Sequence, residues 1–208
     1  MTISAKHSHL HNTSSDAFHF LFLKFFANRG MLFEPQCLSG QFITRRSVRR
    51  YKPDPVPQEL LDQVMEAGLY AASGMGRQGS VILQVTDKAL RDRLMRLNAA
   101  VMGREDTDPF YGAPALLIVL SDRQYSTYLY DGSLVMGNMM NAAHALGLGS
   151  CWIHRAREEF DSPEGKELLR TLGIKGDYEG IGNLIVGYPD GEIPEAKPRR
   201  EGRVFYAK

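Results

Sequence analysis

The residues best suited to chemistry form one short run, Arg45-Arg46-Ser47-Val48-Arg49-Arg50-Tyr51. Four arginines and a hydroxyl make a dense set of hydrogen-bond donors. The guanidinium group stays charged at all ordinary pH values, and its planar fork matches a phosphate or a carboxylate. Basic runs also occur on solvated surfaces and on faces that bind nucleic acid. The run therefore predicts an anionic partner without saying which anion it is.

A second basic run, Lys197-Pro198-Arg199-Arg200, lies in the Pro-rich tail. The two runs bracket the intervening chain, and folding could bring them to one anion. In that arrangement the anion would be surrounded by Arg45, Ser47, Lys197 and Arg199. The remaining cations, Arg50, Lys52 and Arg200, are expected to face solvent.

Composition limits the class of protein. The chain has 208 residues, 43% of them hydrophobic, which suits one domain with a substantial core or one domain with an appendage. Its 25 Lys and Arg against 24 Asp and Glu give no global charge that would favour binding to nucleic acid or to a membrane surface. Cys37 and Cys151 lie far apart, so neither a disulfide framework nor a metal site is predicted, and the cytoplasm is the expected compartment.

Residues 1–32 are expected to form an N-terminal extension, either disordered or an accessory helix. The first 15 residues are polar and contain His7, His9 and His11; this spacing could bind a metal, but incidental histidines in a mobile leader are favoured. The apolar run 18–26 is interrupted by Lys24 and is too short to span a membrane. It also lacks the pattern of a signal peptide. The main domain is expected over residues 33–208.

Apolar periodicity in that domain alternates between helical and strand-like spacing. Helices are predicted after Pro57 to about residue 72, over 88–101, 128–146 and 162–172. Strands are predicted over 81–86, 115–120, 150–153 and 181–186. The helix over 128–146 is rich in Gly, Ala, Ser and Met, so it should pack closely, either inside the core or at a subunit interface.

Four motifs in order resemble the nitroreductase family of FMN-dependent NAD(P)H oxidoreductases. They are Arg45-Arg46-Ser47-Val48-Arg49, Ala72-Ser73-Gly74, Gly147-Leu148-Gly149-Ser150-Cys151-Trp152-Ile153, and a closing Gly187-Tyr188-Pro189 with Lys197-Pro198-Arg199. The resemblance covers about residues 33 to 200. It implies an α+β fold with a central, mostly antiparallel sheet wrapped by helices. It also implies an intertwined homodimer with a C-terminal arm and two FMN sites at the subunit interface.

The resemblance also implies roles for individual residues. Arg45, Arg46 and Ser47 match the contacts to the FMN phosphate and ribityl chain, and Arg49 matches the basic residue near flavin N1 and O2. Lys197 and Arg199 match the phosphate contacts of the tail, and Asn98 matches a flavin-contacting Asn. The stretch Cys151, Trp152, Ile153 and His154 matches the strand whose backbone passes the flavin ring.

The chain departs from the family beyond the Ser73-Gly74 turn. Many members have Asn-x-Gln-Pro-Trp there, whereas this chain has Gly76-Arg77-Gln78-Gly79-Ser80 and keeps only Gln78. The departure affects the expected substrate-side wall rather than FMN binding. Arg77 either adds a cation to that wall or faces solvent.

Three further features have open interpretations. His154 is a candidate proton donor to a substrate, or a structural residue at a strand end. The acidic loop with Glu105, Asp106 and Asp108 is expected to be solvated, and Tyr111 either borders the ligand cleft or packs in the core.

The leading functional hypothesis is an oxidoreductase with bound FMN. NAD(P)H would give a hydride to the flavin and leave, and a small acceptor such as a nitroaromatic or a quinone would then take the electrons, in ping-pong order. A non-catalytic FMN carrier or sensor is the alternative, suggested by the altered loop. Binding of nucleic acid by the arginines is a third, disfavoured hypothesis, and neither nucleic acid nor a membrane is expected as a partner.

Overall fold

The computed structural model describes residues 35–207. The chain divides into two compact units, residues 1–40 and residues 41–208. The predicted N-terminal extension and its three histidines lie outside the described residues. The first described helix, α2, covers Pro35–Thr44 and ends directly before the arginine run.

A four-stranded antiparallel sheet forms the centre of the second unit, in the order β1-β2-β4-β3. The strands are β1 (Ser80–Val85), β2 (Ala115–Asp122), β3 (Gly149–Ile153) and β4 (Tyr178–Gly187). The inner strands β2 and β4 are buried along almost their whole length. The sheet is therefore covered on both faces, as the continuous apolar sequence of β2 predicts.

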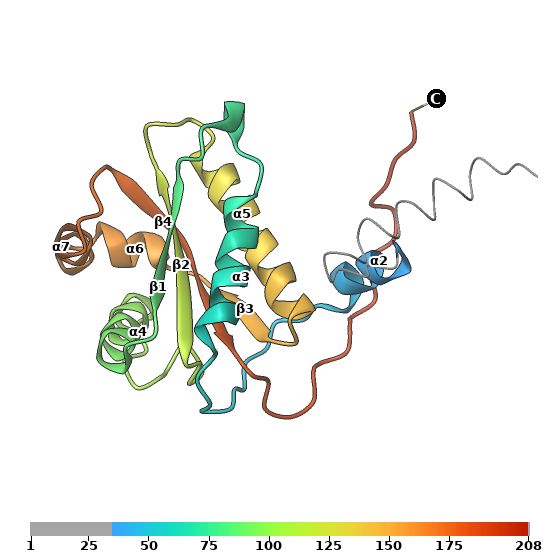
Figure 1. Cartoon of the computed structure of the whole chain (residues 1–208), viewed down its shortest axis with the longest axis horizontal. Helices are drawn as coiled ribbons and strands as arrows, with labels where there is room; N and C mark the ends of the chain where they lie inside the picture. The colour runs from blue at the N-terminus through green and yellow to red at the C-terminus, as the bar shows by residue number, and fades with distance from the viewer. Residues whose placement is uncertain (1–34, 208) are drawn as a thin grey trace, which may run out of the picture. The chain divides into compact units, whose positions relative to one another are not determined.

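Two helical layers provide that cover (Figure 1). On one face lie α3 (Gln58–Leu69) and α5 (Tyr128–Ala145), and on the other lie α4 (Lys88–Met102), α6 (Ala156–Asp161) and α7 (Pro163–Thr171). Alternate residues of β2 separate accordingly, because successive strand side chains point to opposite faces. Leu117 and Val119 join the core under α3 and α5, while Leu116 and Ile118 join the core under α4 and α6.

The helix α5 packs in the core, which is one of the two roles that its composition suggests. Met136 and Met139 are fully buried against the sheet and α3. On its other side Tyr130 and Leu134 are exposed large apolar residues. One face of α5 thus builds the core, and the opposite face is left apolar at the surface.

The predicted elements agree with the structure to within a few residues, and the α+β class with its antiparallel sheet is confirmed. The predicted helix after Pro57 ends at Leu69 rather than near residue 72, because the chain turns there into the short 3₁₀ helix η1 (Gly74–Gly76). Helix α6 was not predicted. It has only six residues, too few to show a helical period.

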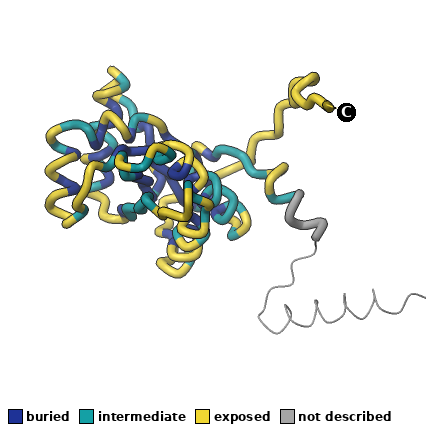
Figure 2. Tube along the Cα trace, turned by 90° about the horizontal axis from the view of Figure 1, so that it is seen from above, coloured by how far each residue is buried: buried dark blue, intermediate teal, exposed yellow. Residues whose placement is uncertain are grey.

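Burial falls off sharply after β4. Residues 190–207 are all exposed, in contrast to the buried strands (Figure 2). None of the helices in the described part of the chain is long and apolar enough to cross a membrane.

Candidate functional site

The arginine run lies along the free edge of β3. Ser47 forms an isolated parallel bridge with Ser150, and the Val48 amide donates to the Ser150 carbonyl at 3.0 Å. Farther along, Tyr51 bridges Pro189, and the Lys52 amide donates to the Tyr188 carbonyl at 2.9 Å. The run is thus held at two points, against β3 and against the residues that follow β4.

Apolar contacts hold the same run in place. Val48 is buried, and a Cβ at Gly149 would lie only 2.9 Å from Val48 side-chain atoms, so the approach requires glycine. The Tyr51 hydroxyl donates to the Val48 carbonyl at 2.7 Å, and burial raises the pKa of this phenol. Val48 and Tyr51 therefore anchor the run, and the polar residues around them are left for other contacts.

Arg45 and Arg46 keep buried donors without partners. The Arg46 Nη1 donates to the carbonyls of Ile43 at 2.6 Å and Arg45 at 2.7 Å. In contrast, Arg46 Nε and Arg45 Nη1 are buried and have no hydrogen-bond partner among the described residues. A buried, unpaired donor on a charged group is costly, so these atoms suit an anionic ligand.

His144 of α5 lies next to these arginines. Its Nε2 is 2.9 Å from the Thr44 hydroxyl. Burial lowers the pKa of this imidazole below its usual range, and the charges of Arg45 and Arg46 lower it further. The imidazole is therefore neutral near pH 7, in a region where positive charge is concentrated.

The other predicted cations of the two basic runs are placed differently. Arg50 is exposed and forms an ion pair with Asp190 at 3.7 Å, in agreement with its predicted solvent-facing position. Lys197 and Arg199 are exposed and make no hydrogen bond or ion pair within residues 35–207. The structure thus brings the first run to β3, while the contacts of Lys197 and Arg199 with an anion stay a prediction.

Arg49 and the end of β3 meet in one cavity of about 500 Å³. Trp152, Ile153, His154 and Arg155 supply one wall, and residues of the α4–β2 loop supply the other. His154 is exposed, whereas Cys151 is buried in the core. Four residues predicted to lie around the ring of a ligand, Arg49 and 152–154, therefore line the same space.

The α4–β2 loop of this cavity is only partly solvated. Glu105 and Asp106 are exposed as predicted. Asp108 differs, because its carboxylate accepts from Arg91 Nη2 at 2.5 Å and from the amides of Phe110 at 2.7 Å and Gly112 at 2.8 Å. This carboxylate shapes the loop and so holds Tyr111, which lines the cavity with a left-handed backbone, φ 53°.

A buried polar cluster lies behind the His154 wall. Asn98 is fully buried; its Nδ2 donates to the His154 carbonyl at 2.9 Å and to Glu159, and its Oδ1 accepts from Arg155 Nε at 2.9 Å. Asn98 therefore supports the wall from inside, and its predicted flavin contact stays a prediction. Arg155 itself has φ 78°, a strained value for a residue with a side chain.

Glu159 is the acid at the centre of this cluster. It is 1% exposed and accepts from Asn183 Nδ2 at 3.0 and 3.2 Å. Burial raises its pKa to about 8, against the hydrogen bonds from Asn98 and Asn183, which lower it. The Oδ1 of Asn183 has no partner in the described structure. A protonated Glu159 would be able to donate to that oxygen after a flip of the amide.

The Gly76–Ser80 loop lies at the other end of the sheet. At one end of the sheet, Ser80 of β1 is paired with Ser121 of β2, which is paired with Glu179 of β4. At the opposite end, Ser150 of β3 is paired with Val186 of β4, which is paired with Ala115 of β2. Ser121 and Ala115 are separated along β2 by about 20 Å at the usual rise per residue. Gln78 is exposed beyond the Ser80 end, so within one chain it lies far from Ser47.

Arg77 of the same loop lies over the Tyr125 ring, with its guanidinium carbon 5.3 Å from the ring centre. The loop is further held by Asp131 of α5, which accepts from the Gly74 amide at 3.0 Å. Both contacts fix the shape of this altered loop.

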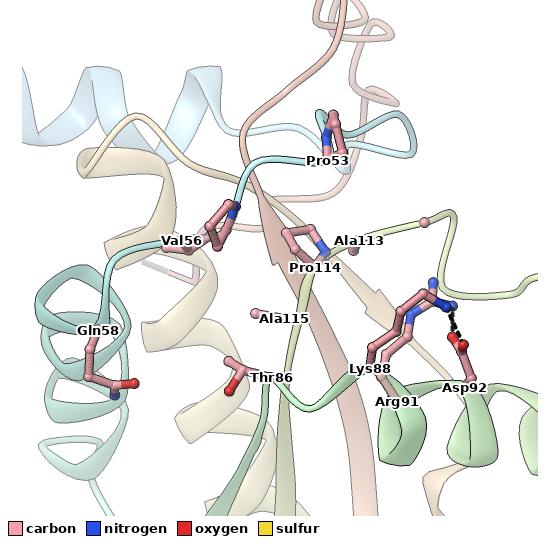
Figure 3. Close-up of a pocket in the computed structure, with 12 residues that line it drawn as sticks. Pro53, Val56, Gln58, Thr86, Lys88, Arg91, Asp92, Ala113, Pro114 and Ala115 are labelled. Atoms are coloured by element: carbon pink, nitrogen blue, oxygen red, sulfur yellow. Dashed lines mark hydrogen bonds and ion pairs between the residues drawn. The ribbon is translucent and has the colours of Figure 1, made fainter.

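A larger cavity, about 650 Å³, lies near the first turns of α3 and α4 and contains none of the predicted site residues (Figure 3). Its cations Lys88 and Arg91 both pair with Asp92. Its charges are therefore compensated locally. Nor does the part of the chain that the structure describes bring three His, Cys, Asp or Glu side chains together as a metal site.

Comparison with known proteins decides the family. The family model described as "Nitroreductase family" matches residues 43–188, which include the arginine run and all four strands. The chain belongs to the nitroreductase family. The predicted resemblance is therefore confirmed over most of the chain.

Individual relatives agree with this assignment. A protein of Archaeoglobus fulgidus, whose name pairs NADH dehydrogenase with NAD(P)H nitroreductase, is 29% identical over 163 residues, covering 76% of this chain and 87% of that protein. The "FMN reductase [NAD(P)H]" of Bacillus subtilis is 26% identical over 174 residues, covering 74% and 66%. A crystal structure of a Bacteroides fragilis nitroreductase with bound FMN superposes with a TM-score of 0.75 at 27% identity, covering 82% of this chain and 98% of that one.

Four site residues of this nitroreductase-family chain escaped the sequence reasoning. His144 is one residue of a helix noted for its small side chains, and Arg104, which lines the cavity at the end of β3, belongs to a loop without periodicity. Arg155 directly precedes α6 and Glu159 lies within it, and this helix was not predicted. No local pattern marks any of these residues, because their positions in the candidate site depend on how distant segments fold together.

The Glu159 cluster leads to a prediction about stability and pH. Because the folded-state pKa of about 8 exceeds the ordinary 4.5, the protonated form is favoured by folding. This contribution to stability is complete below pH 4.5 and is lost as pH rises to 8, by up to about 1.4 kcal/mol per pH unit. Glu159→Gln, which mimics the protonated acid, should remove this loss.

Urea unfolding of wild type and variant between pH 5 and 8.5 measures the difference. The free energy of unfolding of Glu159→Gln, relative to that of wild type, should increase as pH rises. An exposed glutamate of α3 that is not among the causes of this shift provides the control, Glu66→Gln, which should follow the wild-type curve. Parallel curves for wild type and Glu159→Gln would disprove the assignment.

Proposed function

We propose that this chain binds FMN and acts as an NAD(P)H-dependent oxidoreductase on small acceptors such as nitroaromatics or quinones. The observation that carries the proposal is the arrangement at β3. Arg45, Arg46 and Ser47 lie beside the strand with unpaired cationic donors, and Arg49 enters the cavity formed by the end of that strand. The Bacteroides fragilis structure with bound FMN shares this fold.

The residues present fit the cofactor. Arg45 and Arg46 would hold the phosphate, since they have buried guanidinium nitrogens without partners, and Ser47 would hold the phosphate or ribityl chain. The backbone of Cys151, Trp152 and Ile153 would run past the ring, with His154 at its edge. Lys197 and Arg199 would complete the phosphate contacts, and Gln78 would contact the flavin ring.

FMN, when bound, supplies the redox chemistry: it takes a hydride from NAD(P)H and gives two electrons to the acceptor, in ping-pong order. Overall, NAD(P)H, a proton and a quinone become NAD(P)⁺ and a hydroquinone. The protein's part is to bind, orient and polarise. Arg49 is exposed and forms no ion pair with another described residue, so its charge is available to stabilise a reduced, anionic ring.

The separation of Gln78 from Ser47 supports the homodimer. Since these residues lie at opposite ends of one chain's sheet, both can reach one FMN only if a second copy supplies the Gly76–Ser80 loop. The exposed apolar face of α5 offers a surface for that copy. The exposed tail, residues 190–207, is then the arm that would wrap the partner. We assign the protein to the cytoplasm, in keeping with its two cysteines.

The role of Arg49 is tested by comparing it with the next arginine. Arg49→Ala should weaken FMN binding about tenfold or lower the reduction potential of the bound flavin, because a cation near the ring is lost. Arg50→Ala is the matched control, since Arg50 is exposed and paired with Asp190. Quenching of Trp152, the only tryptophan of the chain, measures FMN affinity in apoprotein. Unchanged affinity and potential in Arg49→Ala would refute its role.

Anaerobic mixing separates the enzyme from the carrier or sensor. Holoprotein mixed with NADH or NADPH should rapidly lose its visible flavin absorbance and regain it when an oxidising quinone is added. If neither nucleotide bleaches the flavin, the non-catalytic FMN-binding function holds instead. A colourless protein that FMN cannot reconstitute would contradict both.

The dimer prediction has its own variant. Leu134 is 50% exposed on α5, and Leu134→Lys should shift the protein from dimer to monomer by placing charges in an apolar interface. Leu172 is 45% exposed just after α7, so Leu172→Lys is the matched control and should remain dimeric. Sedimentation velocity measures both. A Leu134→Lys dimer as stable as wild type would place the interface elsewhere.

A further inference from the structure

The cavity at the end of β3 has more positive charge than the cofactor motifs explain. Its lining contains three arginines from three separate segments: Arg49, Arg104 and Arg155. Arg49 belongs to the arginine run, which already accounts for the proposed FMN site. Arg104 from the α4–β2 loop and Arg155 from the β3–α6 junction belong to none of the four family motifs.

The lining contains one carboxylate, and it is already engaged. Asp108 binds Arg91, whose side chain is 10% exposed, and two backbone amides of its own loop. Its charge is therefore used on the inner side of the loop and does not neutralise the arginines of the cavity. The neighbouring Glu105 and Asp106 are not part of the lining.

Arg104 and Arg155 keep donors free for a ligand. The Arg104 side chain is exposed and forms no ion pair or hydrogen bond with a described residue. Arg155 uses only Nε, on Asn98 Oδ1, so both terminal nitrogens of its fork lack partners in the described part of the chain. Burial raises the pKa of nearby Glu159 to about 8, so near pH 7 that acid is mostly protonated and leaves the Arg155 charge uncompensated.

The rest of the lining is suited to a flat ring. Tyr111 is 43% exposed and is held by its loop at the cavity, and Met102 and Pro109 add apolar surface. An aromatic ring can lie against such a wall while an acidic substituent reaches a guanidinium fork. One cavity thus combines surface for a ring with two free forks.

We propose that this cavity selects aromatic or quinone acceptors that carry a carboxylate or sulfonate, with Arg104 and Arg155 pairing with that anionic group. The proposal rests on the proposed function and adds its substrate class. Arg104 and Arg155 are then specificity-determining residues, distinct from the arginines assigned to FMN.

Equilibrium binding tests the proposal without turnover. Oxidised holoprotein is titrated with benzoate and with its neutral analogue benzamide, and the change in flavin absorbance gives each dissociation constant. Wild type should prefer benzoate, and the preference should weaken with added salt because the cations are partly exposed. Arg104→Gln should weaken the binding of benzoate about fivefold and change the affinity for benzamide less than about twofold.

Two further variants control this result. Arg104→Lys keeps the charge and should retain most of the preference, which separates charge from loop damage. Arg96→Gln removes an exposed arginine of α4 outside this cavity and should behave as wild type. The proposal would be overturned if wild type bound benzoate and benzamide with equal affinity. It would also be overturned if Arg104→Gln lost affinity for both compounds to the same extent.

A half-reaction experiment distinguishes the acceptor from the nucleotide. Flavin is first reduced with dithionite, so NAD(P)H is absent, and reoxidation by 4-nitrobenzoate is compared with reoxidation by 4-nitrobenzamide in stopped flow. Arg104→Gln should slow only the nitrobenzoate reaction. If it slows flavin reduction by NAD(P)H instead, the arginines serve the nucleotide and the proposal is wrong. A protein without bound flavin would mean failure of the proposed function itself.

Discussion

The site depends on one backbone contact, the bridge that joins Ser47 to Ser150 at the edge of β3. Through it the Val48 amide donates to Ser150, and Val48 closes against Gly149, where a side chain would not fit. A run with four charges has no tendency of its own to lie against a sheet. Two apolar residues inside the run, Val48 and Tyr51, supply that tendency and so hold the charged residues beside the strand.

The position of β3 in the sheet allows the arginine run to bind along it. Because β3 is an edge strand, its outer side is available to the arginine run, while its inner side pairs with the buried β4. The strand ends at Ile153, and after His154 the chain adopts a left-handed conformation at Arg155 and enters α6. Asn98 and Glu159 hold that turn from within. A buried polar cluster therefore supports the cavity wall.

The arginines fall into groups that differ in their ion pairs and hydrogen bonds. Arg50 forms an exposed ion pair with Asp190, and the largely buried Arg91 forms ion pairs with Asp92 and Asp108. Arg45 and Arg46 retain unpaired nitrogens in buried positions, whereas Arg49, Arg104 and Arg155 line an open cavity. Residues of one type thus differ in the partners they have, and partners are a property of the tertiary structure.

The sequence by itself determined the class of fold, the main helices and strands, and the family, since apolar periodicity and short motifs are local properties of the chain. It also identified Arg49 and residues 152–154, which the structure gathers in one cavity. Only the tertiary structure revealed the burial of Glu159 and the strained backbone of Arg155, because both depend on contacts between segments that are distant in the sequence. It likewise separated Gln78 from Ser47, since the register of an antiparallel sheet decides which ends of its strands lie together.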